Sequence, residues 1–120
     1  MHNPKPTSSR IGAAAETRAQ RYLEEQGLTF ISRNYRCKCG EIDMIFKQLN
    51  TWVFVEVKYR SKQMFGNAVE QLSYHKQRKV LNAVRVFLLD NHLNEYHTPI
   101  RIDFIALTDT SIEWIKNVTG

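Results

Sequence analysis

The sequence has no long hydrophobic run, and its uninterrupted apolar stretches are only a few residues long. A membrane-spanning helix needs about 20 consecutive apolar residues, so we expect no membrane partner. The opening segment, MHNPKPTSSR, also lacks the apolar stretch and small-residue cleavage site of a secretory signal, which argues against export. We therefore expect a cytoplasmic protein.

Cysteine is scarce, with Cys37 and Cys39 the two in the chain. A single residue separates them, which is too close for an unstrained disulfide and does not match the spacing of a paired zinc knuckle. A zinc site would need two more ligands from the histidines, none of which has metal-site spacing to another ligand. Both cysteines are interpreted as free thiols, and surface or capping roles are expected for His75, His92 and His97.

Repeats and low-complexity tracts are also absent. Of the 120 residues, 42% are hydrophobic and 24% are charged, a composition typical of a folded globular protein rather than a disordered chain. Because domains commonly run roughly 100 to 200 residues, the chain is expected to form one domain over residues 1–120, with residues 1–8 flexible.

Positive charge is unevenly distributed along the chain. The net charge is +5, with six basic and three acidic side chains in residues 34–63, four and one in residues 64–89, but two and five in residues 90–120. A basic middle segment suits a polyanionic partner, for which phosphate is the commonest choice. An ordinary soluble surface explains the same charge equally well.

Hydrophobic periodicity predicts an α/β protein. Apolar residues at spacings of three and four indicate two helices, and β-prone or alternating runs indicate five strands. The helices are expected over residues 10–26 and 73–91, the strands over residues 29–36, 41–47, 52–60, 100–107 and 111–118, and a loop over residues 61–72. This order is an α-β-β-β-α-β core with a mixed central sheet flanked by helices, plus an extra C-terminal strand.

The second and third strands are predicted to form a hairpin with its turn at Leu49–Asn50. This register puts Asp43 opposite Glu56 and Glu41 opposite Lys58. It also places six apolar residues on one core face, namely Ile42, Met44, Phe46, Val53, Val55 and Val57. The other face has an apolar patch that a second layer or a subunit contact must cover, formed by Ile45, Trp52 and Phe54.

The charged end of this hairpin contains an unfavourable pair. Glu41 and Lys58 fit an ordinary ion pair, but Asp43 facing Glu56 does not, because like charges directly across a strand pair are destabilising. Two carboxylates held close together suit a hard divalent cation such as Mg²⁺. Lys58, on the same side of its strand as Glu56, could polarise an attacking water or stabilise developing negative charge. The hairpin therefore predicts a metal-assisted hydrolytic site.

These residues match a known pattern. Asp43 followed on the next strand by Glu56-Val57-Lys58 resembles the active-site signature of the PD-(D/E)XK nuclease superfamily, which includes restriction endonucleases and archaeal Holliday junction resolvases. The residue before Asp43 is Ile42 rather than the proline of the superfamily name. The resemblance implies a restriction endonuclease-like fold.

A narrower resemblance covers nearly the whole chain after residue 9. The chain is similar to the YraN family of uncharacterised bacterial proteins, on five short motifs. These are GAAAE at 12–16, RNYR at 33–36, GEID at 40–43, FVEVKYR at 54–60 and RIDFI at 101–105. The GEID and FVEVKYR motifs together make this resemblance specific.

The superfamily resemblance also implies roles for single residues. Asp43 and Glu56 would bind Mg²⁺ or Mn²⁺ with the backbone carbonyl of Val57 as a third ligand, and Lys58 would be the catalytic lysine. Glu16 matches the helix-one glutamate that joins this site in the resolvase-like branch. Without the resemblance, an exposed helical carboxylate is the preferred interpretation of Glu16. Gln71 is an accessory polar candidate.

Basic residues near this hairpin are candidates for nucleic-acid binding. By neutralising phosphates they would give salt-sensitive affinity with little sequence preference. They are Arg36, Lys38, Arg60, Lys62, Lys76, Arg78 and Lys79. For each taken singly, plain solvation is the alternative. Tyr59 and Phe65 could stack on an unpaired base, but core burial is the favoured interpretation.

Three functions therefore stay open. The leading one is a metal-dependent endonuclease that hydrolyses phosphodiester bonds of DNA, with branched or structured DNA among the candidate substrates. The main alternative is a non-catalytic nucleic-acid-binding module that keeps the nuclease fold, and a weaker one is a protein-interaction domain. Because junction resolvases act as dimers, the resemblance adds a homodimer as a candidate assembly.

Overall fold

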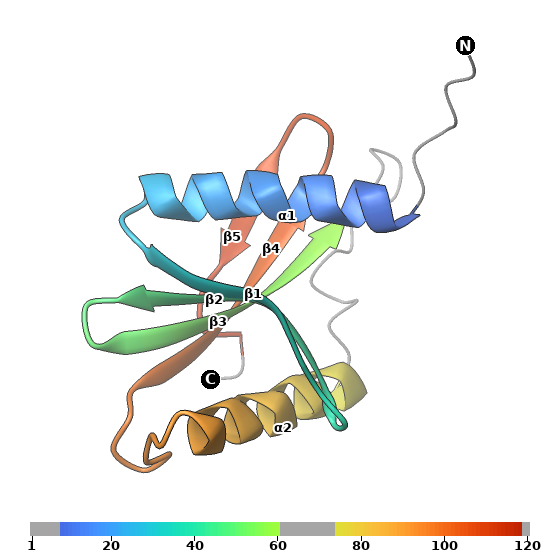
Figure 1. Ribbon diagram of the computed structural model, residues 1–120. Coiled ribbons are helices and arrows are strands. Elements are labelled where there is room, and N and C mark those ends of the chain that lie inside the picture. The colour runs from blue at the N-terminus through green and yellow to red at the C-terminus, as the bar shows by residue number, and fades with distance from the viewer. Residues whose placement is uncertain (1–7, 61–73, 119–120) are drawn as a thin grey trace.

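The structure, a computed structural model, describes residues 8–60 and 74–118. Its elements follow the predicted order (Figure 1). They are α1 (Ser8–Glu25), β1 (Thr29–Cys37), β2 (Gly40–Gln48), β3 (Thr51–Tyr59), α2 (Tyr74–Asp90), β4 (Ile100–Leu107) and β5 (Ile112–Ile115). The predicted flexible segment 1–8 lies outside the described residues except for Ser8, which begins α1, and the predicted loop 61–72 lies outside them entirely.

The five strands form one mixed sheet in the order β1-β2-β3-β4-β5. β3 and β4 are parallel and are connected through α2, whereas the other neighbouring strands are antiparallel. α1 covers one face of the sheet and α2 covers the other (Figure 1). The predicted fold class is therefore confirmed. Neither described helix offers the long apolar stretch that crossing a membrane requires.

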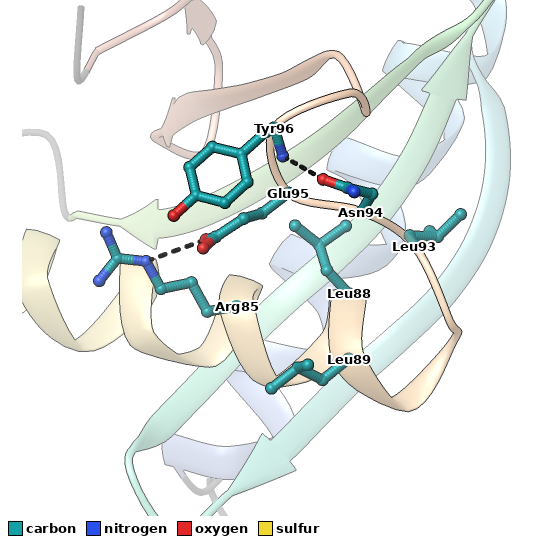
Figure 2. A pocket seen from close by; sticks show the side chains of 7 residues that line it. All are labelled: Arg85, Leu88, Leu89, Leu93, Asn94, Glu95 and Tyr96. Atoms are coloured by element: carbon teal, nitrogen blue, oxygen red, sulfur yellow. Dashed lines mark hydrogen bonds and ion pairs between the residues drawn. The ribbon is translucent and has the colours of Figure 1, made fainter.

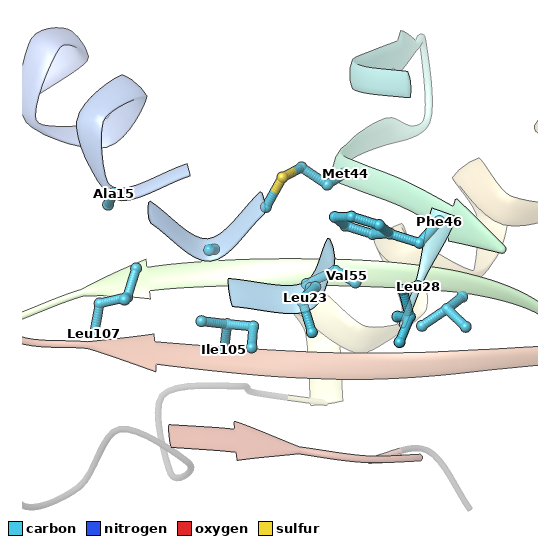
Figure 3. Packing of buried hydrophobic residues seen from close by; sticks show 10 residues of the cluster. Ala15, Leu23, Leu28, Met44, Phe46, Val55, Ile105 and Leu107 are labelled. Carbon is cyan, nitrogen blue, oxygen red and sulfur yellow. The ribbon is translucent and has the colours of Figure 1, made fainter. Parts of the chain in front are cut away.

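α1 buries one side against the sheet because small and apolar residues recur at helical spacing. Ala15, Ala19 and Leu23 are at most 4% exposed. They form the first core cluster with residues from the strands, among them Met44, Phe46, Val55, Ile105 and Leu107 (Figure 3). Gly27 follows the helix with a φ of 96°, a left-handed conformation that glycine adopts without steric cost.

α2 covers the opposite face and buries the apolar patch predicted on the hairpin. Phe87 stands at the centre of this second cluster, with its ring 5.3 Å from Tyr35, 5.5 Å from Trp52 and 5.6 Å from Phe54, measured between centroids. Edge-to-face pairs of this kind add about 0.5–1.5 kcal/mol each beyond the burial of apolar area. The second layer predicted to cover the hairpin is therefore α2.

Two residues with positive φ end elements in the C-terminal half. His92 adopts a φ of 56° after α2, and the N–H of Leu93 donates back to the last helical turn at 2.8 Å. This geometry closes the helix, and His92 is exposed, which agrees with the surface or capping role predicted for it. Asn117 adopts a φ of 55°, and this turn out of the extended conformation accounts for β5 being shorter than the predicted strand.

The β2–β3 hairpin has the predicted register, with Met44 opposite Val55. That pair is also where the described ladder ends, so the predicted pairing of Asp43 with Glu56 is not part of it. The start of β2 bends away from β3 while staying paired with β1. The β1–β2 register shifts between Phe30 and Ser32, and bulges of this kind bend a strand pair. A gap therefore opens between β2 and β3 beyond their last paired residues.

The bent end of the β1–β2 hairpin lies against α2 (Figure 1). A Cβ atom on Gly40 would come within 2.8 Å of the backbone oxygen of Lys79, so this approach requires glycine. Gly40 thus lets the tip of the β1–β2 hairpin pack directly against the backbone of α2.

Two predictions for the start of β2 are wrong. Glu41 does not lie opposite Lys58 in the described ladder; it pairs across β1 with Arg36, with Nε and Oε2 3.5 Å apart. Ile42 packs in the cluster under α2 instead of sharing the α1-side core with Met44. Both differences follow from the bend, which alternation along a straight strand does not include.

Candidate functional site

Asp43 and Glu56 lie on the two sides of the gap between β2 and β3. Glu56 is 3% exposed, although it carries a carboxylate in the middle of the sheet. Asp43 is half-buried, and its Oδ2 accepts a hydrogen bond from the backbone N–H of Val57 at 2.8 Å. The backbone of β3 thus holds the Asp43 carboxylate beside Glu56 where the strand ladder has ended.

The two carboxyl groups oppose each other's ionisation. Burial raises the pKa of Glu56 to about 8, and the neighbouring charge of Asp43 raises it further. Burial also raises the pKa of Asp43 to about 6, against the opposing effect of the Val57 hydrogen bond, and the charge of Glu16 adds a smaller increase. Keeping both groups ionised near neutral pH therefore requires a nearby cation.

One cation is already in contact with the pair. The ammonium of Lys76, from the first turns of α2, lies 3.3 Å from Oε2 of Glu56. The other oxygen, Oε1, is buried and has no hydrogen-bond partner among the described residues. A buried acceptor without a donor is costly, so this oxygen is available for a further ligand.

The donor set fits a hard divalent cation. Asp43 and Glu56 supply carboxylate oxygens, and because the N–H of Val57 faces β2, its carbonyl faces the same side of β3. No group of three His, Cys, Asp or Glu residues clusters within the parts of the chain that the structure describes. Mg²⁺ commonly binds through one or two carboxylates with water and substrate oxygen completing its shell, so two carboxylates suffice.

Lys58 follows Glu56 by two residues on β3 and is half-buried. Burial lowers the pKa of its ammonium, and the positive charges of Lys76 and Arg60 lower it further. A lysine with a lowered pKa next to carboxylates is suited to exchanging a proton with water or to stabilising a developing anion. The charges of Asp43 and Glu56 act in the opposite direction on this pKa, so Lys58 lies within electrostatic reach of both carboxylates.

Glu16 approaches the same site from α1, and Arg33 holds it there. Arg33 donates to the carbonyl of Ala13 at 2.8 Å and to Oγ1 of Thr17 at 3.2 Å, and its Nε lies 3.5 Å from the Glu16 carboxylate. Sequence reasoning missed this arginine. Its motif was recognised, but no local pattern places a strand residue against a helix 16 or more residues earlier in the chain.

Two adjoining concavities surround these groups. The first, of about 180 Å³, we call the acidic cleft; it is lined by Gly40, Glu41, Asp43, Glu56, Lys76, Lys79 and Val80. The second, of about 430 Å³ and more open, we call the hairpin hollow; it is lined by Arg36, Cys37, Lys38, Cys39, Gly40, Glu41 and Lys79. They share three lining residues, so the carboxylates and a group of basic side chains face one continuous depression.

The predicted nucleic-acid-binding residues are only partly brought together. Lys76 and Lys79 line the acidic cleft, and Arg36 and Lys38 line the hairpin hollow. Arg78 is exposed on α2 but lines neither. Arg60 follows β3, and its Nη1 donates to the carbonyl of Tyr59. Two further candidates, Lys62 and Gln71, lie outside the described residues, as does Phe65.

Another pocket lies near the opposite end of α2 (Figure 2). It has a volume of about 310 Å³ and is lined mainly by leucines together with Tyr96 and an Arg85–Glu95 ion pair at 3.5 Å. Its lining contains neither a carboxylate pair nor a group of basic side chains. The acidic cleft is therefore the better candidate for chemistry.

A second buried carboxylate, Asp103 on β4, was also missed by sequence reasoning. It is fully buried and accepts hydrogen bonds from Nε of Arg101 at 2.9 Å, from Nε1 of Trp114 at 2.9 Å and from the N–H of Asn117 at 2.9 Å. The Arg101 guanidinium forms a forked contact, with a second nitrogen 3.0 Å from the other oxygen. These donors satisfy both oxygens, which is typical of a structural ion pair.

Comparison with known proteins places the chain in a family. Residues 15–107, which include the acidic cleft and most of both helices, match the family described as "Uncharacterised protein family UPF0102". The chain belongs to the UPF0102 family. This is the family that the sequence motifs resemble under the name YraN.

Bacterial relatives align with the UPF0102 chain over almost its full length. A UPF0102 protein from Colwellia psychrerythraea is 45% identical over 92% of this chain and 89% of its own. One from Shewanella sediminis is 43% identical over 98% of this chain and 97% of its own, and one from Saccharophagus degradans is 44% identical over 88% and 89%. These names carry no reaction, so the function must be argued from the site.

Proposed function

We propose that this UPF0102 protein is a metal-dependent nuclease that hydrolyses phosphodiester bonds of DNA at the acidic cleft. The observation that carries the proposal is the buried Glu56 carboxylate beside Asp43, with an oxygen that no described residue satisfies. Folding a protein around two carboxylates that raise each other's pKa is unfavourable unless a ligand uses them. The resemblance of Asp43 and Glu56-Val57-Lys58 to the PD-(D/E)XK signature supports the same assignment.

Each group in the cleft has a defined task in this proposal. Asp43, Glu56 and the Val57 carbonyl would hold Mg²⁺ or Mn²⁺, which when bound neutralises the phosphate and makes water more acidic. Lys58 orients the attacking water and stabilises negative charge at the phosphorus centre. Glu16, held by Arg33, adds a carboxylate at the α1 side of the site, where it can accept a proton from water.

The surroundings of the cleft favour a substrate that carries several phosphate groups, as DNA does. The hairpin hollow continues from the carboxylates and brings Lys38 and Lys79 to the same depression, with Arg36 at its edge. Their positive charges suit the phosphates that flank the scissile bond. Binding through such contacts weakens steeply as salt increases and depends little on base sequence.

A non-catalytic nucleic-acid-binding module is the second candidate, and one contact favours it. Lys76 lies 3.3 Å from Glu56 and already provides a positive charge next to the pair. In a module that has lost catalysis, this ammonium replaces the metal ion and the basic hollow alone binds the phosphates. The two candidates therefore differ in whether a divalent cation displaces Lys76 from Glu56.

Cleavage assays with defined variants separate these candidates. Labelled linear, single-stranded and junction DNA is incubated with the protein and Mg²⁺ or Mn²⁺. We expect cleavage that falls at least about 100-fold in Asp43→Asn, Glu56→Gln and Lys58→Ala, because each removes charge stabilisation at the reacting phosphate. Glu24→Gln, a change to an exposed carboxylate on α1, is the matched control and should cleave normally.

Each other result has a defined meaning. Cleavage that survives Asp43→Asn or Lys58→Ala would exclude the acidic cleft as the active site. Salt-sensitive DNA binding without cleavage under either metal would favour the binding module. A protein that binds no nucleic acid even at low salt would exclude both and leave the protein-interaction domain.

A further inference from the structure

Cys37 is the last residue of β1 and Cys39 lies in the two-residue turn that follows, and both side chains are partly exposed in the hairpin hollow. Both are free, as predicted. A single residue separates them, and both line the same hollow. The structure thus brings two free thiols together in one accessible place.

This arrangement makes the two thiols unequal. The hydrogen bond from Cys39 lowers the pKa of Cys37, although burial and the carboxylate of Asp90 act in the opposite direction. The same contact raises the pKa of Cys39. Basic side chains of the hollow, Lys38 and Lys79 among them, add positive charge around the pair. Two adjacent thiols of unequal pKa suit the roles of an attacking and a resolving cysteine.

We propose that Cys37 and Cys39 form an oxidisable dithiol that reacts reversibly with hydroperoxides. The Cys37 thiolate attacks one oxygen of hydrogen peroxide, the O–O bond breaks, and hydroxide leaves as Cys37 becomes a sulfenic acid. The sulfur of Cys39 then attacks the Cys37 sulfur, and the sulfenic oxygen leaves as water. Both thiols are oxidised to one disulfide while the peroxide is reduced to two waters.

The spacing of the pair makes the oxidised form easy to reverse. A disulfide across a single intervening residue is strained, and strained, exposed disulfides are the ones that thiol reductants open most readily. The neighbouring Gly40 lies against the backbone of Lys79, so closure of the ring acts directly on the contact between the hairpin tip and α2. This modification site does not depend on the nuclease assignment.

The test uses the full-length protein, reduced and freed of reductant, with hydrogen peroxide as the only oxidant. We expect both thiols to become inaccessible to alkylation and the intact mass to fall by two hydrogen atoms, with both changes reversed by dithiothreitol. The reaction should be at least about tenfold faster than that of free cysteine at the same pH, because the basic side chains of the hollow favour the thiolate form of Cys37.

Single serine variants assign the roles. In Cys39→Ser, the sulfenic acid on Cys37 has no resolving partner and should be captured by dimedone. In Cys37→Ser, oxidation should slow at least about tenfold, because the attacking thiol has been removed. Equal rates in the two variants, oxidation of the wild type no faster than free cysteine, or a product that is a disulfide-linked dimer would each overturn the proposal. Circular dichroism checks that both variants keep the fold.

Discussion

The protein buries carboxylates in two regions of one sheet, and the two regions are built differently. Asp103 on β4 is fully buried and surrounded by donors from Arg101, Trp114 and Asn117. Glu56 on the adjacent strand is 3% exposed, lies beside another carboxylate and leaves one oxygen without a partner among the described residues. The two carboxylates are therefore about equally buried, but Asp103 is fully hydrogen-bonded and Glu56 is not.

The difference separates structural carboxylates from those available to a ligand. A buried charge that is fully hydrogen-bonded stabilises the fold only as part of its network, and removing one member leaves the others unsatisfied. A buried carboxylate with too few donors costs stability in the free protein and can recover that cost when a cation binds. Asp103 is the first kind, and the Asp43–Glu56 pair is the second.

The sharpest way to break this comparison is to remove one carboxylate from each region. Asp103→Ala leaves the Arg101 guanidinium and the Trp114 N–H without their partner, so we expect a loss of about 3–5 kcal/mol in unfolding free energy. Glu56→Gln removes a charge that is already unfavourable and should leave stability unchanged or higher at pH 8. Chemical denaturation monitored by circular dichroism measures both.

A neighbouring surface carboxylate supplies the control for this experiment. Glu113→Ala changes an exposed residue on β5, the strand that contains Trp114, and should stay within about 0.5 kcal/mol of the wild type. If Glu56→Gln destabilises the protein as much as Asp103→Ala does, the distinction between the two regions is wrong.

The pH dependence of stability should come from the Asp43–Glu56 pair. The unfolded chain releases these protons near the ordinary pKa values of 3.8 and 4.5, whereas the folded protein holds them until about 6 and 8. Between these values the folded state binds more protons, so raising the pH favours unfolding. We expect unfolding free energy to fall by an amount on the order of 5 kcal/mol from about pH 5 to about pH 8.5.

Substitution shows which residue is responsible for this slope. Glu56→Gln should flatten the profile most, Asp43→Asn should flatten it less, and Glu113→Gln should leave it as in the wild type. Denaturant midpoints measured at each pH in metal-free buffer give the profiles. A wild-type stability that increases toward pH 8.5, or a slope that Glu56→Gln does not change, would contradict the assignment.

Local sequence patterns predicted much of the fold and the identity of the central site residues. Alternation gave the register that puts Met44 opposite Val55, and helical spacing gave the buried side of α2 around Phe87. Both signals are local, because the residues that share a face recur at the period of their own element. The same pattern identified Asp43 and Glu56, although the ladder ends one residue pair before them and Asp43 binds the N–H of Val57 instead.

The remaining features depend on how separate elements approach one another. The bend of β2, which moves Glu41 away from Lys58, begins where pairing with β3 ends and pairing with β1 continues. Arg33 reaches α1, and Asp103 is satisfied by a backbone N–H 14 residues later. No periodicity within a strand encodes such contacts, because they are set by the packing of the finished sheet.

The smallest predicted effect tests the comparison through a ligand. If the Asp43–Glu56 pair binds a divalent cation, Mg²⁺ or Mn²⁺ should stabilise the protein at pH 8, where the repulsion between the two charges is strongest. At a concentration about ten times the Kd, the gain is about 1.4 kcal/mol. Thermal unfolding with increasing metal measures it, and Asp43→Asn should abolish it, while Asp103 is already saturated with donors and should contribute nothing.

A third variant distinguishes metal binding from the permanent ion pair with Lys76. Lys76→Gln removes the ammonium that competes for Glu56, so the concentration of Mg²⁺ needed for half of the stabilisation should fall, while the effect of the metal persists. The exposed Glu24→Gln variant should respond as the wild type does. If Mg²⁺ stabilises Asp43→Asn as much as the wild type, the metal binds elsewhere on the protein. The positive charge next to Asp43 and Glu56 would then be the Lys76 ammonium alone.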